Sequence, residues 1–433
     1  MIQELLRNLQ IPSLNDVQQA TLDASDTQEN ILLLSPTGTG KTLAFLLPVY
    51  NSLDLQISDV QVIILVPSRE LALQIESVFR KMASGFKVSC CYGGHPFSVE
   101  KQNLHQPPAV LVGTPGRIAD HIQRGSVDVS KANTLVLDEF DKSLELGFAK
   151  EMTYIIQNLK SINKRYLTSA TKLETLPSFL GVENFFEINF LTGALPAGLN
   201  LKVVQSKVKA KEEHLFNLIC SFKNSQSLIF CNHREIVENV QMKLQSMGLT
   251  TEMFHGGMDQ VEREKALVKF KNGSSPVLVC TDLAARGLDI SEVKFIVHYQ
   301  LPLDQKSFIH RNGRTARMNT EGVSYIFLTE NEYLPGYIPK SVQDEKLLSA
   351  GRPITPEWVT LYISFGKKDK INKVDIVGFI LQNGKLDKSE LGKIEVQDRI
   401  SFAAVARDKA ASLLAQLNDK KIKNKKVKVE IAR

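Results

Sequence analysis

The sequence predicts an α/β protein with three folded domains, and three observations support this. Short apolar runs of strand type alternate with segments of helical periodicity through most of the chain. The runs are apolar throughout, which is typical of parallel sheets covered by helices on both faces. The final segment instead has the order βαββαβ, and 433 residues suffice for about three domains.

The first α/β domain is expected over residues 1–195. The run "ILLLS" precedes the helical segment "GKTLAFLLPVY", and "VIILVPS" precedes "RELALQIESVFRKM", in which Leu71, Ile75 and Phe79 share one face. The runs "AVLVG", "TLVLD" and "RYLTSA" continue the series. We therefore predict a parallel sheet with helical crossovers.

A second α/β domain is expected over residues 196–335. The segment "LTGALPAGLN" contains Gly and Pro and interrupts the first series. The runs "SLIFC", "PVLVCT", "FIVHYQ" and "VSYIFLT" form the second series. Residues 336–357 are rich in proline and have little strand character, which predicts a connector.

The C-terminal domain is expected over residues 358–433. Its segments "TLYIS", "KVDIVGFILQN", "GKIEV", "ISFAAVA", "RDKAASLLAQLN" and "KVKVEIA" predict an RRM-like fold, with Tyr362 and Phe402 as ring candidates on the central strands. This region has 17 Lys and Arg against 9 Asp and Glu, whereas the rest of the chain has 36 against 38. Such an excess suits phosphate binding, although the charge count alone fits a solvated tail equally well.

Two classes of protein are disfavoured by the sequence. No apolar run approaches the ~20 residues of a membrane span, and the N-terminus lacks the pattern of a signal peptide. The five cysteines form no CxxC pair and have no His partner at zinc-ligand spacing. We expect a monomeric, cytoplasmic protein with reduced thiols and no membrane partner.

The segment "SPTGTGKT" lies between an apolar run and a helical segment. Backbone N–H groups at such a helix N-terminus surround phosphate, and the helix dipole favours an anion there. We expect Lys41 to reach the β and γ phosphates and Thr42 to hold Mg²⁺. Ser35 replaces the first glycine of the usual pattern, and the alternative is a glycine-rich turn without a ligand. The residues expected around the phosphates are Ser35, Thr37, Gly38, Thr39, Gly40, Lys41 and Thr42.

The segment "DEFD", residues 138–141, follows an apolar run. In a nucleotide-binding sheet, Asp138 is expected to hold the metal and Glu139 to orient and deprotonate the attacking water. The alternative is an acidic helix start, because acidic residues favour the first helical turn. The phosphate-binding pattern earlier in the chain favours the catalytic interpretation.

The segment "HRNGRTAR" places Arg311, Arg314 and Arg317 at every third position. On a helix these side chains would share one broad face and could approach an anion together. A guanidinium binds phosphate oxygens bidentately and stabilises charge at the γ-phosphate. The alternative is a basic helix that faces solvent.

Eight segments resemble, in order and spacing, the motifs of the DEAD-box ATP-dependent RNA helicases. They are "SPTGTGKT", "PSRELA", "GG" at 93–94, "TPGR", "DEFD", "SAT", "TDLAARGLDI" and "HRNGRTAR". The resemblance spans about residues 1–330. It implies two tandem RecA-like domains that bind ATP, Mg²⁺ and RNA.

The resemblance also implies roles for individual residues. Lys41, Asp138 and Glu139 would act in hydrolysis, with Arg314 and Arg317 as arginine fingers. Gln18 would read adenine, and Asp289 would contact the ribose. Residues that couple hydrolysis to unwinding would be Asp141, Ser169, Thr171 and His310. The RNA backbone would contact Arg69, Gly94, Thr114, Arg117, Gln260, Arg263 and Thr281.

Three departures from the family pattern affect these expectations, and one is that the aromatic residue usual well upstream of the glutamine would fall at Met1 or before it. Leu14 and Asn15 stand where the family usually has Pro-Thr before the glutamine at position 18. Phe140 stands where the family has alanine, and it adds a large ring to the carboxylate motif. We expect hydrolysis to be retained and its coupling to RNA to be altered.

The C-terminal segment resembles the RNA-binding domain of the DbpA subgroup of this family. The matching segments are "GKKDKI", "GKIEVQDRISFAAV" and "LNDKKIKNKKVKVEIAR". The resemblance implies binding to a hairpin of 23S-type large-subunit ribosomal RNA and action on pre-50S particles. Candidate RNA contacts are Lys367, Lys368, Lys370, Arg399, Lys420, Lys421, Lys423, Lys425 and Lys426.

We therefore expect an ATP-dependent RNA helicase that locally unwinds duplexes of large-subunit ribosomal RNA during ribosome assembly. One alternative is a general RNA helicase that acts on messenger RNA or cold-shock duplexes. Another is an RNA-binding clamp or chaperone in which Phe140 has weakened the coupling to ATP.

Overall fold

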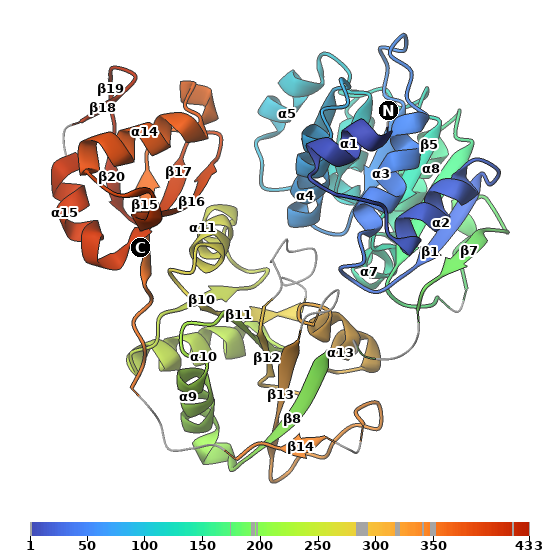
Figure 1. The fold of residues 1–433 in the computed structure, drawn as a ribbon. Helices are drawn as coiled ribbons and strands as arrows, with labels where there is room; N and C mark the ends of the chain where they lie inside the picture. The colour runs from blue at the N-terminus through green and yellow to red at the C-terminus, as the bar shows by residue number, and fades with distance from the viewer. Residues whose placement is uncertain are drawn as a thin grey trace. The chain divides into compact units, whose positions relative to one another are not determined.

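The fold comes from a computed structural model, drawn in Figure 1. The chain divides into two compact units; the first contains one seven-stranded sheet, and the second contains a seven-stranded sheet, a four-stranded sheet and a two-stranded hairpin. The α/β class expected from the sequence is confirmed. Among the residues that the structure describes, no helix is long and apolar enough to cross a membrane. The described residues are 2–173, 175–191, 195, 198–282, 293–316, 321–339, 342–346, 352–417 and 420–432.

The first sheet has seven parallel strands in the order β3-β4-β2-β5-β6-β1-β7. Successive side chains of a strand point to opposite faces, so Ile31 and Leu33 enter one core whereas Leu32 and Leu34 enter the other. The sheet is therefore buried on both sides, as the apolar runs predicted. Its strands are β1 (Asn30–Leu34), β2 (Val62–Leu65), β3 (Val88–Cys91), β4 (Val110–Gly113), β5 (Thr134–Leu137), β6 (Lys164–Ser169) and β7 (Phe186–Asn189).

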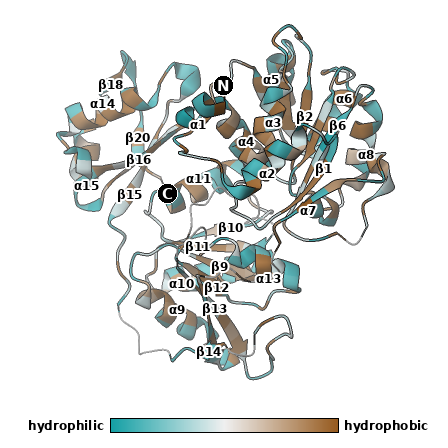
Figure 2. Ribbon diagram, turned by 45° about the vertical axis from the view of Figure 1, so that its right-hand side comes forward, coloured by the Kyte–Doolittle hydropathy of each residue, from teal (hydrophilic) through white to brown (hydrophobic). Residues whose placement is uncertain are grey.

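Helices cover both faces of this sheet. Helices α1 to α4 contribute to the first core and α5 to α8 to the second. Figure 2 shows hydrophilic and hydrophobic residues on the same helices, as expected when one helical face meets a core. The helices are α1 (Ile2–Asn8), α2 (Asp16–Ser25), α3 (Lys41–Asn51), α4 (Arg69–Lys81), α5 (Phe97–Leu104), α6 (Pro115–Gln123), α7 (Phe140–Glu145) and α8 (Ala149–Asn158).

The second sheet repeats this architecture, with seven parallel strands in the order β10-β11-β9-β12-β13-β8-β14. Its central strands β9 and β11 are mostly apolar, and all their residues except Thr281 are buried. The strands are β8 (Leu199–Ser206), β9 (Ser227–Cys231), β10 (Thr251–Phe254), β11 (Val277–Thr281), β12 (Phe295–His298), β13 (Gly322–Thr329) and β14 (Gln343–Asp344). The described helices are α9 (Lys211–Ser221), α10 (Arg234–Ser246), α11 (Gln260–Lys271) and α13 (Gln305–Asn312).

The third sheet is antiparallel, with the order β16-β17-β15-β20. The expected βαββαβ order is confirmed, and a small hairpin that the sequence did not predict precedes the last strand. The elements are β15 (Trp358–Ile363), α14 (Lys373–Gly384), β16 (Leu391–Val396), β17 (Ser401–Ala406), α15 (Arg407–Leu417), the hairpin strands β18 (Lys421–Ile422) and β19 (Lys425–Lys426), and β20 (Val429–Ile431).

Within the second unit, one face of the antiparallel sheet contacts α11 and the turn after it. Phe402 is 1% exposed and packs with Val268 of α11 and with Ala432. The hydroxyl oxygens of Ser274 and Thr360 lie 2.6 Å apart. Phe402 therefore offers no exposed ring for base stacking, in contrast to the rings on the sheet of a typical RRM.

Candidate active site and RNA-binding surfaces

The phosphate-binding loop connects β1 to α3. Gly38 and Gly40 have φ values of 87° and 84°, a left-handed conformation that side chains other than glycine rarely adopt. The carbonyl of Gly40 accepts hydrogen bonds from the N–H groups of Leu43 and Ala44, which begins the helix. The strand, loop and helix expected from the sequence are therefore present, with the helix N-terminus beside the loop.

The charged group of the loop is Lys41, whose side chain is buried. Its Nζ donates to the carbonyl oxygen of Ser35 at 2.5 Å. The hydroxyls of Ser35 and Thr39 lie 2.6 Å apart. The serine at the unusual first position therefore takes part in the loop's own hydrogen bonds.

Asn15 and Gln18 lie against the same loop. They form a reciprocal capping box at the start of α2, and Asn15 Nδ2 also donates to the carbonyl of Thr39 at 2.9 Å. A Cβ atom at Gly40 would lie 2.5 Å from Gln18 Nε2, so this position has no room for a side chain. Asn15, a departure from the family pattern, thus ties the Gln18 segment to the phosphate-binding loop.

The two carboxylates follow β5 directly, and both side chains are buried. Thr168 of β6 donates from Oγ1 to Asp138 Oδ1 at 2.5 Å, and its hydroxyl accepts from the N–H of Glu139 at 3.1 Å. Burial raises the pKa of Asp138, while the bond from Thr168 and the charge of Lys41 oppose this rise. Thr168 was not predicted from the sequence, although its place just before the "SAT" segment was an available signal.

Glu139 adopts a left-handed conformation, with φ 49° and ψ 49°, at the start of α7. Its side chain makes no capping hydrogen bond to this helix, although its carbonyl accepts from the N–H groups of Lys142 and Ser143. The geometry therefore differs from an acidic helix cap, the alternative considered for this motif.

The residues of the first unit that are expected to couple hydrolysis to unwinding lie close together. Thr171 Oγ1 donates to Asp141 Oδ2 at 2.7 Å, and the Ser169 hydroxyl accepts from the N–H of Thr171 at 3.1 Å. All three side chains are buried. A displacement of the "SAT" segment would therefore act directly on Asp141 of the carboxylate motif.

The expected RNA contacts of the first unit lie at the carboxyl ends of β2, β3 and β4. Arg69 begins α4, and a Cβ atom at Gly94 would lie 2.6 Å from Arg69 Nη1. Thr114 is the N-cap of α6, on which Arg117 follows. These four residues come from three successive strand-to-helix connections of one sheet.

Arg117 is anchored by a network that the sequence did not reveal. Its Nε donates to Glu100 Oε2 at 2.6 Å, and Glu100 is 1% exposed. The same carboxylate lies 2.8 Å from His121 Nε2 and accepts from the N–H of Tyr92 at 3.1 Å. Cys91 Sγ lies within 4.8 Å of ligand atoms of Glu100 and His121, but these atoms already bond to one another and to Arg117.

In the second unit, the expected RNA contacts lie on α11 and at the end of β11. Gln260 Nε2 donates to Glu264 Oε1 at 2.8 Å. The Arg263 guanidinium lies 4.8 Å from the ring centroid of Phe254. Thr281 is the last residue of β11 and is half-buried.

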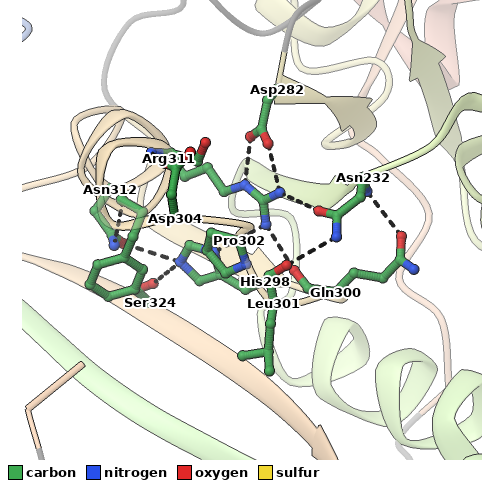
Figure 3. Close-up of polar contacts among 12 residues, drawn as sticks. Asn232, Asp282, His298, Gln300, Leu301, Pro302, Asp304, Arg311, Asn312 and Ser324 are labelled. Atoms are coloured by element: carbon green, nitrogen blue, oxygen red, sulfur yellow. Dashed lines mark hydrogen bonds and ion pairs between the residues drawn. The ribbon is translucent and has the colours of Figure 1, made fainter. Parts of the chain in front are cut away.

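The arginine motif does not present one shared face. Arg311 is 1% exposed, and its Nε and Nη2 donate to the two carboxylate oxygens of Asp282 at 2.5 and 2.8 Å (Figure 3). Its guanidinium also donates to Asn232 Oδ1 at 2.7 Å and to the carbonyl of Gln300 at 2.8 Å, and Nη1 lies 3.5 Å from His298 Nδ1. The expectation that Arg311 approaches an anion together with its neighbours is therefore wrong, because its guanidinium is occupied inside the protein.

The helical spacing behind that expectation also fails. Helix α13 ends at Asn312, so Arg314 lies in the turn that follows. His310, in the last turn of α13, and Arg314 are both buried. Arg317 and Asp289 lie outside the described residues.

The candidate lysines of the C-terminal domain form one surface, which we call the basic loop cluster. It comprises residues 366–370 after β15, 397–399 between β16 and β17, and 420–426, which include the β18–β19 hairpin. Lys423 Nζ donates to the carbonyl of Lys370 at 2.8 Å, and the N–H of Lys368 donates to the carbonyl of Asp398 at 2.8 Å. The exposed cations of this cluster are Lys367, Lys368, Lys370, Arg399, Lys420, Lys421, Lys423, Lys425 and Lys426.

The phosphate-binding loop after β1 and the buried carboxylates after β5 belong to one parallel sheet, as in P-loop nucleoside triphosphatases. Family models match the chain as DEAD/DEAH box helicase at residues 15–177, as helicase conserved C-terminal domain at 210–319 and as DbpA RNA binding domain at 360–431. The chain belongs to the DEAD-box ATP-dependent RNA helicases of the DbpA type.

Similar proteins agree with this assignment. The chain is 32% identical to the ATP-dependent RNA helicase DbpA of Escherichia coli (strain K12), over 98% of this chain and 96% of that one. It is 29% identical to DbpA of Bacillus subtilis (strain 168), over 96% and 94%. The solved structure of S. cerevisiae Dbp5 bound to RNA and ADP BeF3 has a TM-score of 0.69 at 27% identity, over 76% of this chain and 88% of that one.

Proposed function

We propose that this RNA helicase unwinds duplexes of large-subunit ribosomal RNA during ribosome assembly, targeted by its C-terminal domain to a 23S-type hairpin on pre-50S particles. The observation that carries the proposal is the basic loop cluster on a domain of the DbpA RNA-binding type. Nine exposed cations on adjacent loops suit a folded RNA backbone.

In the proposed site, Lys41 binds the β and γ phosphates, and Thr42 and Asp138 hold Mg²⁺. A hydroxyl and a carboxylate are the hard oxygen ligands that Mg²⁺ prefers, and a nearby cation would offset the burial of the charge on Asp138. When bound, the metal neutralises charge on the phosphates. Glu139 orients the attacking water and accepts its proton.

The remaining nucleotide and RNA contacts follow the family pattern. Gln18 reads adenine, Asp289 contacts the ribose, and Arg314 and Arg317 stabilise charge at the γ-phosphate. Arg69, Gly94, Thr114, Arg117, Gln260, Arg263 and Thr281 bind the sugar-phosphate backbone. Backbone contacts give affinity but little sequence choice, so selectivity must come from another domain.

The C-terminal domain supplies that selectivity through its loops in this proposal. Phe402 is buried against α11, which leaves the basic loop cluster as the surface for RNA. Binding there raises the local concentration of nearby duplex around the two RecA-like domains.

The proposal is tested by measuring binding of the full chain to a large-subunit ribosomal RNA fragment with the hairpin and to an unrelated hairpin of equal length. Both measurements are made over a range of salt concentrations, because phosphate contacts make affinity salt-dependent. We expect tighter binding of the ribosomal fragment at every salt concentration. Equal affinities would contradict ribosomal targeting.

A further inference from the structure

Phe140, the departure from the family pattern, is part of the apolar core of the first unit. It is the first residue of α7 and is 0% exposed. Its cluster includes Met152 and Ile155 of α8 and also Leu180. The ring therefore lies in a packed interior, in which a displaced side chain leaves a void.

The ring of Phe140 contacts Phe179. The two ring centroids lie 6.3 Å apart with an interplanar angle of 71°, an edge-to-face arrangement. Phe179 belongs to the short helix Ser178–Leu180 in the segment that follows the "SAT" residues. Leu173 and Leu176 of this segment pack against the same core.

Two contacts thus join the carboxylate turn to the "SAT" segment and its continuation. One is the polar contact between Asp141 and Thr171, at 2.7 Å. The other is the apolar contact between Phe140 and Phe179. Phe140 lies between Glu139 and Asp141 in the chain, so anchoring its ring constrains both carboxylates.

We propose that Phe140 and Phe179 act as a positioning pair that holds Glu139 and Asp141 in place and transmits movement of the segment after "SAT" to them. The pair touches neither nucleotide nor RNA, and its function rests on the proposed roles of Glu139, Asp141 and Thr171. The sequence suggested that the ring at Phe140 disturbs coupling. The packing instead indicates that Phe140 and Phe179 together form a coupling contact.

The test compares Phe140→Leu, Phe179→Leu and the double variant with the wild-type chain. Leucine keeps the core apolar and removes the aromatic contact. We expect each single variant to unwind about fivefold fewer duplexes per ATP hydrolysed, with little change in the KM for ATP. We expect the double variant to unwind as many duplexes per ATP as either single variant, because contacting residues act as a unit. Effects that multiply in the double variant would overturn the proposal.

Phe79→Leu is the matched control. Phe79 is 1% exposed and lies in the core on the opposite face of the same sheet, so its loss of packing is similar. We expect this variant to lose stability without a change in duplexes unwound per ATP. An equal loss in Phe79→Leu would show that Phe140 and Phe179 contribute only stability.

Amide hydrogen exchange at residues 139–145 gives a readout that does not depend on RNA. We expect faster exchange there in Phe179→Leu and unchanged exchange in Phe79→Leu. Unchanged exchange in Phe179→Leu would overturn the positioning pair whatever the enzyme does. An absence of RNA-stimulated hydrolysis in wild type would instead count against the proposed function, so the two failures are distinguishable.

Discussion

The α/β domains and the C-terminal domain place their functional charges in opposite environments. Asp138, Asp141 and Arg311 are 3%, 2% and 1% exposed, and each is hydrogen-bonded to a side chain on a neighbouring strand or loop. The lysines of the basic loop cluster are exposed, and their ion pairs are with other exposed or half-buried groups, as between Lys423 and Asp375. Buried charges need fixed partners, whereas exposed charges act together and are screened by salt.

The largest effect is expected at the buried carboxylates and the phosphate-binding loop. Glu139→Gln removes the group that we propose accepts the proton of water, so we expect the rate of ATP hydrolysis to fall about 10²–10⁴-fold. Lys41→Ala should also abolish turnover, through loss of phosphate binding. The exposed Glu183→Gln is the control, and steady-state ATPase assays give the rates. Retained turnover in Glu139→Gln would contradict the assignment.

A large loss of stability is expected on breaking the buried arginine network. Arg311→Ala leaves Asp282 and Asn232 without their shared donor, so we expect the free energy of unfolding to fall by about 3 kcal/mol. Arg234→Ala, at an exposed ion pair with Glu235, should leave the free energy of unfolding almost unchanged. Urea denaturation measures both variants, and equal small losses would show that the network does not stabilise the domain.

A smaller effect, with a definite sign, is expected from the burial of Asp138. Because burial raises its pKa, the native state favours the protonated form, and ionisation reduces stability as the pH rises through that pKa. Asp138→Asn mimics the protonated form. We therefore expect this variant to be more stable than wild type at pH 7, with a difference that shrinks as the pH falls.

The raised pKa of Asp138 should affect activity in the opposite direction to stability: acidification should lower the ATPase activity. Protonation of Asp138 would remove the proposed metal ligand, so ATPase activity should fall on acidification at a higher pH than for an ordinary aspartate. Higher Mg²⁺ concentration should move this loss to lower pH, because the metal competes with the proton. A pH profile that does not respond to Mg²⁺ would count against Asp138 as a ligand.

The smallest effects are expected at single residues of the basic loop cluster. Lys421→Ala should weaken hairpin binding only a few-fold, since each exposed lysine contributes about one phosphate contact. Changing Lys367, Lys370 and Lys421 together should make binding less dependent on salt. The slope of log K against log salt concentration should become shallower by about 0.9 for each phosphate contact that is lost. Lys388→Ala, exposed but outside the cluster, is the control. An equal loss in Lys388→Ala would show that charge alone sets the affinity.

The sequence predicted much of this architecture because its signals are local. The apolar runs of β1, β5 and β11 and the glycines of the phosphate-binding loop are read within a few residues. The βαββαβ order of the C-terminal domain was predicted for the same reason. The hairpin of β18 and β19 was missed, since strands of two residues give no periodicity.

Contacts between distant segments were not predictable in this way. Thr168 meets Asp138 because β6 lies beside β5, and Asp282 meets Arg311 because β11 and α13 lead to one edge of the second sheet. The spacing of the arginines suggested a common face, but α13 ends before Arg314. Phe140 contacts Phe179, which lies 39 residues later in the chain, and no sequence motif indicates this contact.

In the proposed function, ribosomal RNA bound by the C-terminal domain directs the helicase to its substrate. The most direct measurement is the ATPase rate of the full chain with no RNA, with generic single- and double-stranded RNA, and with a large-subunit ribosomal RNA fragment that carries the hairpin. We predict strong stimulation by the ribosomal fragment and weak stimulation by generic RNA. Equal stimulation by all RNAs would contradict the claim and indicate a general RNA helicase.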